Sequence, residues 1–223
     1  WNGTVYALCA FALLVIAAYH ILIFAKRPED RENILFAFIN IVTAFYLCVF
    51  YIDDLPDLPF RGLNFLTFQK IFSYSLPFLL IYFVGSFVQV FLSAKDIRLV
   101  KIARRILVLI PVAVLFVAPN YPVLRKLWGI CQIMLLPHIV YIAIVMVRSL
   151  KKGKNEVVPL FIGFSPFLLA IVLDLIHNLL HWYALPYISM YGWMLVIIML
   201  LFILASKCTA ARNEAEDLNA NLE

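Results

Sequence analysis

Seven long, nearly uninterrupted apolar runs limit the fold of this chain more than any other feature. A helix needs about 20 apolar residues to cross a bilayer. A segment in lipid must satisfy its own backbone hydrogen bonds, which favours helices, and the period-two alternation typical of a membrane barrel is missing. The predicted spans cover about residues 3–25, 33–52, 70–92, 103–118, 127–147, 159–181 and 187–206. The pattern predicts an all-α integral membrane protein, a seven-transmembrane helix bundle.

Composition excludes a water-soluble enzyme. Hydrophobic residues make up 65% of the 223 residues and charged residues 14%, with a mean hydropathy of +0.98. Soluble domains average about 45–50% apolar and about 25% charged residues. Seven spans leave no room for a soluble catalytic domain, so we expect no enzyme and no cofactor within these residues.

The basic residues fall on one side of the predicted bundle. Lys and Arg number 18 in total, and most of them lie in alternate connections and in the tail: Lys26, Arg27, Arg31, Lys95, Arg98, Lys101, Arg104, Arg105, Arg148, Lys151, Lys152, Lys154, Lys207 and Arg212. The opposite side holds Arg61, Lys70, Arg125 and Lys126. Basic loops mark the cytoplasmic face, which predicts an outer N-terminus and a cytoplasmic C-terminus. Membrane lipids, not nucleic acid, are the expected partners of these charges.

The composition changes abruptly after Ser206, which divides the chain into a membrane domain at 1–206 and a cytoplasmic helix at 207–223. Small and apolar residues follow one another at spacings of four and three, as in a coiled-coil seam: Leu204, Cys208, Ala211, Ala215, Leu218 and Leu222. A solvated amphipathic tail is one interpretation. We favour a signalling helix that pairs with a second subunit, because neither Pro nor Gly separates it from the last span. This interpretation predicts a homodimer.

One face of the sixth span carries most of the polar residues expected inside the membrane. These residues are Asp174, His177, Asn178 and His181, at helical spacing, and the fifth span adds His138. Three interpretations stay open: an interhelical hydrogen-bond network, a ligand- or proton-sensing pocket, and a metal site formed by Asp174, His177 and His181. The third would suit a zinc-dependent membrane hydrolase or a transporter. A hydrolase also needs an acid/base partner, and we find no second carboxylate in any span.

A second polar set lies in the inner halves of the first three spans: His20, Asn40, Ser86 and Gln89. We expect Asn40 and Gln89 to form hydrogen bonds between helices. Lys70, at the outer end of the third span, is expected to extend its amine toward the interface. Prolines at 77, 111, 137 and 166 are expected to kink their helices.

Several motifs resemble those of bacterial seven-transmembrane receptors with diverse intracellular signalling modules. The first span ends in YHILIFAKR at 19–27 and is followed by NILFAF at 33–38. The last span is introduced by LPY at 185–187 and by Tyr191-Gly192, and the tail ends in LNANLE at 218–223. Where many members carry an acidic residue four positions after the glycine, this chain has Val196.

The resemblance implies a receptor domain of the bacterial cytoplasmic membrane that passes an outside signal through the last span. It also implies partners beyond these residues: a fused extracellular sensory domain before the first span, and a cytoplasmic output domain, such as a two-component kinase, after the tail. The alternative function is the transporter or hydrolase that would use the face from Asp174 to His181.

Overall fold

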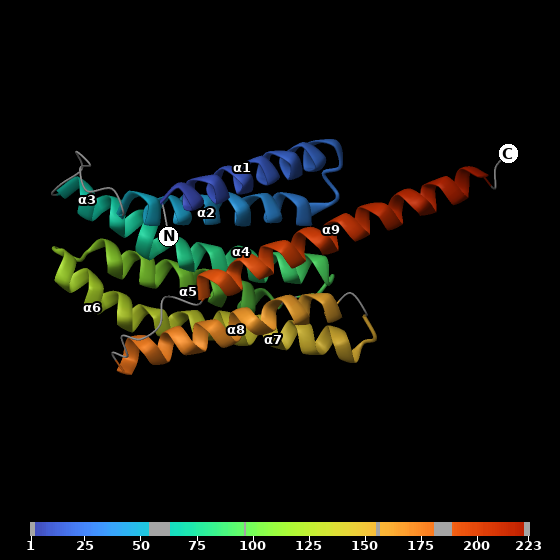
Figure 1. The fold of residues 1–223 in the computed structure, drawn as a ribbon. Coiled ribbons are helices and arrows are strands. Elements are labelled where there is room, and N and C mark those ends of the chain that lie inside the picture. Colours follow the sequence, from blue (N-terminus) through green and yellow to red (C-terminus); the bar gives the residue numbers. More distant parts are fainter. Residues whose placement is uncertain (1–2, 54–62, 96, 155–156, 181–188, 221–223) are drawn as a thin grey trace. The chain divides into compact units, whose positions relative to one another are not determined.

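A computed structural model describes residues 3–53, 63–95, 97–154, 157–180 and 189–220, and all regular structure in these ranges is helical (Figure 1). The helices are α1 (Gly3–Lys26), α2 (Arg31–Asp53), α3 (Leu63–Phe68), α4 (Leu76–Phe91), α5 (Arg98–Phe116), α6 (Tyr121–Cys131), α7 (Leu136–Lys151), α8 (Val157–Leu180) and α9 (Ser189–Ala220). A π-helix, η1 (Gln69–Ser75), joins α3 to α4, and a 3₁₀-helix, η2 (Gln132–Leu135), joins α6 to α7. Each predicted apolar run therefore corresponds to one helical segment.

Four of these segments are long and apolar enough to cross a membrane: Thr4–Lys26, Arg31–Val49, Phe65–Phe91 and Tyr121–Lys151. Two further apolar stretches, Val157–Leu173 and Gly192–Lys207, are shorter. The all-helical, multi-pass character is thus confirmed in the described residues. Seven crossings and the orientation of the chain stay predictions.

Three helical segments begin at least five residues before their apolar runs. The third starts at Leu63 instead of 70, the fourth at Arg98 instead of 103, and the fifth at Tyr121 instead of 127. At the fifth, the Asn120 side chain accepts a hydrogen bond from the Val123 backbone N–H at 3.1 Å, and a proline occupies the first turn. Both features start helices whatever the hydropathy of the turn that follows. Hydropathy therefore located the lipid-compatible part of each helix and missed its first turns.

Two prolines directly follow the non-α segments. Pro77 lies two residues after η1, and Pro137 lies two residues after η2. A proline has no N–H to give and crowds the carbonyl four residues earlier, so the preceding turn has to change its hydrogen bonding. The π-helical turn η1 and the 3₁₀ turn η2 therefore lie where Pro77 and Pro137 disturb the helical hydrogen bonds.

The chain divides into two compact units, Trp1–Val147 and Arg148–Glu223, which are described separately. In the first unit, α2 packs against both α1 and α4 (Figure 1). Phe36, Ile39, Val84 and Phe87 are fully buried there. A second apolar cluster in this unit includes Phe78, Val108, Leu115, Leu124 and Cys131, so it joins α4, α5, α6 and their connections.

In the second unit α8 packs against α9, and α9 extends past α8 (Figure 1). Two glycines bring these helices close together. A Cβ atom at Gly163 would lie 2.7 Å from Met199 Cβ, and one at Gly192 would lie 2.9 Å from Phe167 Cα. Such contacts are typical of membrane helices, whose association depends on close packing.

Candidate functional site

Arg104 lies buried within the first unit, although its place in a basic segment predicted a cytoplasmic loop charge. Its side chain is only 5% exposed, whereas Lys101 and Arg105 on the same helix are exposed. The difference arises because α5 begins at Arg98, so Arg104 already belongs to its second turn and faces inward with Val108 and Leu115. An ionisable side chain buried among membrane helices marks a functional site by default, because it is costly to keep there.

The guanidinium group of Arg104 is held by α4. It donates three hydrogen bonds, to Gln89 Oε1 at 3.2 Å, to the Tyr82 carbonyl at 3.1 Å and to Ser86 Oγ at 3.1 Å. The three acceptors are neutral and lie on one face of the helix, at spacings of four and three residues. The arrangement uses the fixed fork of the guanidinium, which an ammonium group does not have.

Aromatic rings enclose the same group. Arg104 Cζ lies 4.3 Å from the centroid of the Tyr141 ring on α7 and 5.2 Å from that of Tyr82. Both distances are within the range of cation–π attraction. Arg104 therefore connects three helices, and we call Arg104, Tyr82, Gly85, Ser86, Gln89 and Tyr141 the Arg104 junction.

Gly85 provides the space for the guanidinium. A Cβ atom at this position would lie 2.7 Å from Arg104 Nη2 and 3.5 Å from Ile142 Cγ1. Any larger residue at 85 would therefore displace the end of the Arg104 side chain. The glycine is required here by the close approach of a side chain and not by its own backbone angles.

His138, which the sequence placed in the fifth span, is buried beside this junction. It is 1% exposed, and neither ring nitrogen has a hydrogen-bond partner among the described residues. His138 precedes Tyr141 by three residues and Ile142 by four, so it shares their face of α7. A buried polar group without partners is destabilising by about 1–3 kcal/mol, which makes His138 the least satisfied side chain of this face.

The predicted inner polar set does not form one network in the described residues. His20 Nδ1 donates to Asn33 Oδ1 at 2.8 Å, which ties α1 to α2, and the His20 ring packs edge-on against Phe36. Asn40 instead donates to the Phe36 carbonyl of its own helix at 2.8 Å. Gln89 belongs to the Arg104 junction. Of the two expected interhelical bonds, the one of Gln89 is present and the one of Asn40 is not, and His20 adds an interhelical bond at a different helix pair.

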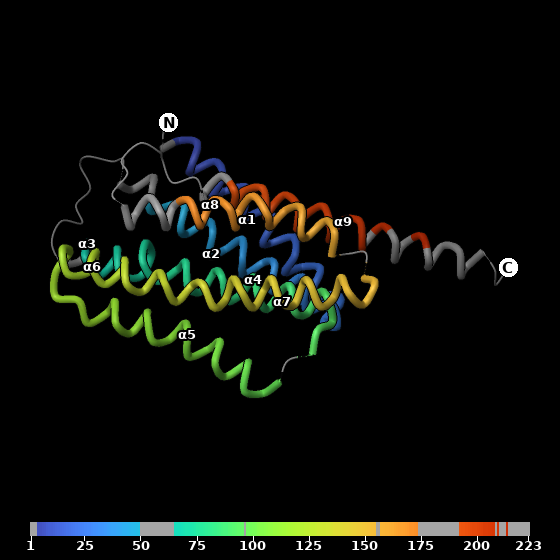
Figure 2. The backbone as a smooth tube through the Cα atoms, turned by 90° about the horizontal axis from the view of Figure 1, so that it is seen from below, coloured from blue at the N-terminus to red at the C-terminus, as the bar shows by residue number. Residues whose placement is uncertain are grey.

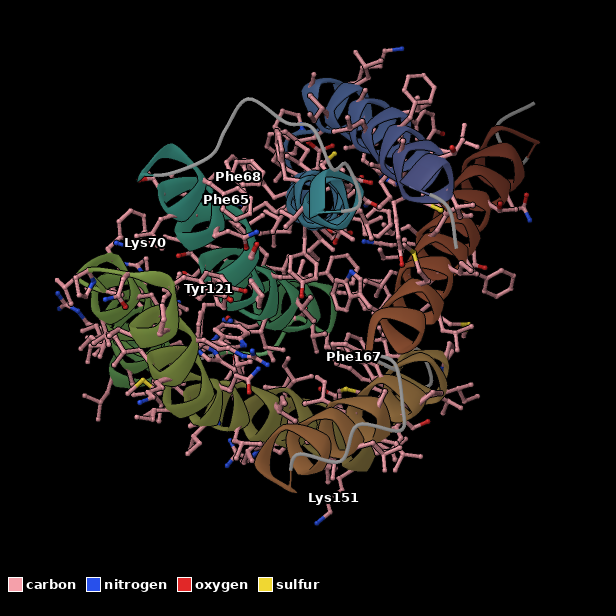
Figure 3. The ribbon with its side chains drawn as sticks, turned by 60° about the vertical axis from the view of Figure 1, so that its left-hand side comes forward. Phe65, Phe68, Lys70, Tyr121, Lys151 and Phe167 are labelled. Carbon is pink, nitrogen blue, oxygen red and sulfur yellow. The ribbon has the colours of Figure 1, made fainter. Side chains whose placement is uncertain are left out.

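Lys70 has a backbone partner. Its Nζ donates to the Phe116 carbonyl at 3.0 Å, at the C-terminal end of α5. A cation at a helix C-terminus is favourable because it meets the negative end of the helix dipole. Figure 3 shows Lys70 at the end of the first unit that also holds Tyr121. Lys70 and Arg104 thus tie the two ends of α5 to the third helical segment.

The predicted polar face of the sixth span lies outside what the structure describes in side-chain detail. Asp174, His177 and Asn178 continue the backbone of α8, but their side chains and the whole of His181 are outside the described residues. No group of three His, Cys, Asp or Glu residues suited to a metal occurs among the residues that are described. The pocket, network and metal interpretations of this face therefore stay predictions.

Part of the predicted seam in the tail is visible. Leu204 is buried, and the backbone from Cys208 through Ala211, Ala215 and Leu218 is helical in α9. The side chains of these four residues, and the whole of Leu222, are outside the described part of the chain. The backbone along the seam is therefore one continuous helix up to Ala220. Pairing of this seam with a second subunit stays a prediction.

The Arg104 junction was not predicted, because position along the chain assigns Arg104 to the basic cytoplasmic segment together with Lys101 and Arg105. A signal was present in the inner half of the third span, where Gly85, Ser86 and Gln89 place one small and two polar residues next to one another on a helix. Polar side chains inside a membrane form hydrogen bonds with polar groups of neighbouring helices. The partner of Ser86 and Gln89 is Arg104 on α5.

Comparisons with known proteins give one result. Searches of the curated proteins and of the solved structures each returned no match. A family model described as 7TM diverse intracellular signalling matches residues 3–207, which is nearly the whole chain. The chain therefore belongs to this family of seven-transmembrane signalling domains.

Proposed function

We propose that these residues relay a signal from the outer side of the membrane, through α9, to a cytoplasmic output domain that follows the tail. Family membership supports a receptor-type signalling domain in a membrane. The relay itself, the dimer, the orientation and the bacterial cytoplasmic membrane as its location belong to the proposal. The transporter and zinc-hydrolase alternatives have no described residue in their favour.

The observation that carries the proposal is the continuity of α9. This helix extends over 32 residues, from Ser189 to Ala220, which corresponds to about 48 Å at 1.5 Å per residue. Its first half is apolar up to Ser206, and its second half contains charged residues such as Lys207, Arg212 and Glu214. A continuous helix transmits rotation or translation along its axis, whereas a flexible linker would absorb such motion.

The mechanism follows from this continuity. An outer ligand, or an outer domain with its ligand, favours one of two helix packings in the membrane. The packing that is populated sets the rotation of α9, and hence the residues that its cytoplasmic half presents to the second subunit. The seam from Leu204 to Leu222 is the surface that would report this rotation.

The test joins residue 223 to a dimer-dependent kinase or cyclase reporter through helical inserts of zero to six residues. Each added residue rotates the output by about 100° relative to α9. Output should rise and fall with a period near seven residues, since a coiled-coil seam repeats at that interval. The matched control carries the same inserts after a Gly-Pro pair that breaks the helix, and its output should not depend on phase.

A flat response over all seven inserts, with the fusion present in the membrane, would contradict the proposal. It would show that the cytoplasmic half of α9 is a passive end.

A further inference from the structure

We infer that the Arg104 junction is a two-state switch in which the guanidinium group docks on α4 or leaves it, and that this choice sets the basal output of the receptor. The inference rests on the proposed function, since it identifies how that relay is regulated. Its evidence is separate and comes from contacts within the first unit.

The docked state is held by contacts that can break together. All three described hydrogen bonds of Arg104 end on one short stretch of α4, from Tyr82 to Gln89, and the stacking partner Tyr141 lies on α7. One rotation of the side chain away from α4 would remove these three hydrogen bonds together. Docking is therefore cooperative, as a switch requires.

Part of the polar set on α4 keeps a described partner when Arg104 leaves. Ser86 Oγ still donates to the Tyr82 carbonyl at 2.9 Å, and Gln89 Nε2 still donates to the Ala94 carbonyl at 3.4 Å. Gln89 Oε1 loses the bond that it accepts from Arg104. Ser86 and Gln89 are only half-buried, so the oxygen that Arg104 leaves is not enclosed in the packed interior, which lowers the penalty for breaking the contact.

Arg104 itself has an alternative environment. It lies six residues after the start of α5 at Arg98, a distance of about 9 Å along the axis. A long arginine side chain can extend its charged end over much of such a distance toward the interface. The exposed Lys101 and Arg105 show that basic side chains of α5 already lie outside the packed interior at this level. Both positions of the guanidinium group are therefore chemically acceptable.

Apart from the junction, α5 meets α4 through the apolar cluster around Phe78, Val108 and Leu115. α5 packs less extensively on α4 than α2 does, and it runs obliquely to α4 and α7 (Figure 2). Loss of the stacked cation changes the contacts of the Tyr141 face of α7, which also carries His138. α7 ends at Lys151, and the chain continues from there into α8 and α9. The junction can thus influence the segment that precedes the signalling hairpin.

Gly85 gives direct experimental control of the switch. The atom that a Cβ at residue 85 would meet most closely is Arg104 Nη2, the far end of a flexible side chain. Gly85→Ala therefore displaces the guanidinium group while the backbone can stay in place. Arg104→Lys provides a second route, because an ammonium group keeps the charge but lacks the planar fork.

The experiment measures basal output of the full receptor–reporter fusion, in the most active helical phase, for Gly85→Ala, Arg104→Lys and Tyr141→Leu. The matched control is Arg105→Lys, the same change at the exposed neighbouring position. The three junction variants should change output in one direction by at least about threefold, since one intramembrane hydrogen bond shifts an equilibrium by roughly that factor. Arg105→Lys should leave output unchanged.

A double variant isolates the cause. If Gly85→Ala acts through the guanidinium group, adding it to Arg104→Met should change output no further than Arg104→Met alone. Additive effects would overturn the inference, and so would unchanged output in Arg104→Lys at equal membrane abundance. If Gly85→Ala does not accumulate in the membrane, Arg104→Lys and Tyr141→Leu decide the question.

Failure of the switch differs from failure of the relay. Junction variants with wild-type output in fusions that still respond to helical phase would reject the switch and leave the proposed function standing. A response that is flat in every phase would reject the relay and, with it, the switch.

Discussion

The α5 segment and the α8–α9 hairpin hold their helices together by opposite means. α5 is tied to the third segment by cations, with Arg104 near one end and Lys70 at the other. α8 and α9 meet instead through Gly163 and Gly192, whose missing side chains let the partner helix approach closely. The side-chain hydrogen bonds of Arg104 and Lys70 can exchange partners by a change of rotamer. The helix contacts at Gly163 and Gly192 can change only if the backbone of a helix moves. This contrast agrees with the proposed switch, in which the contacts of α5 change while α8 and α9 stay packed against each other.

The largest expected effect is on the glycine contacts. Gly192→Leu should lower the free energy of unfolding by about 2–3 kcal/mol, because its Cβ would meet the Phe167 backbone, which cannot step aside as a side chain can. Denaturation by SDS in mixed micelles measures this change. Gly129→Ala is the matched control, since a Cβ at 129 meets nothing within 4 Å. Equal stability of Gly192→Leu and wild type would show that α8 and α9 are not closely packed.

A smaller effect of opposite sign is expected at His138. His138→Leu should raise the free energy of unfolding by about 1–2 kcal/mol, because it removes two buried ring nitrogens that lack hydrogen-bond partners among the described residues. The same denaturation experiment applies. His20→Leu is the control, and it should be destabilising because it breaks the bond to Asn33. A destabilised His138→Leu would mean that the ring has a polar partner in the membrane.

Arg104→Met tests whether the contacts of Arg104 with α4 stabilise the fold or regulate output. Replacing a buried charge by an apolar side chain of similar size is often neutral, since the cost of desolvating the charge disappears with its bonds. We expect a change within about 1 kcal/mol in the free energy of unfolding, together with the altered output described above. A loss well beyond that range would make Arg104 a structural anchor and remove the contrast with the hairpin.

The smallest effect is expected at Lys70. Lys70→Met should lower the free energy of unfolding by about 0.6 kcal/mol or less, because it removes one hydrogen bond to the Phe116 carbonyl near the end of the helix. Output should change less than in the Arg104 variants, because the amine is more exposed than the guanidinium group. An effect on output as large as that of Arg104→Lys would show that both ends of α5 regulate the receptor.

The sequence by itself determined the helical class, the multi-pass character and the family. Apolar runs of membrane length have only one kind of backbone solution in lipid when the alternation of a barrel is missing. The motifs at 19–27 and 185–192 pointed to the family that the match over residues 3–207 shows. The prolines predicted the irregular turns only in part: such turns precede Pro77 and Pro137, whereas Pro111 and Pro166 lie inside continuous α-helices.

Only the tertiary structure decided which polar residues meet. Arg104 and Arg105 are adjacent and chemically identical, yet one is buried against α4 and the other is exposed. His20 and Asn40 looked alike from the sequence, yet one bonds across helices and the other within its own helix. The physical reason is that hydropathy is a property of a run of residues, whereas a hydrogen bond depends on the rotation of two helices about their axes. That rotation is set by packing at glycines and large apolar side chains, which act between segments far apart along the chain.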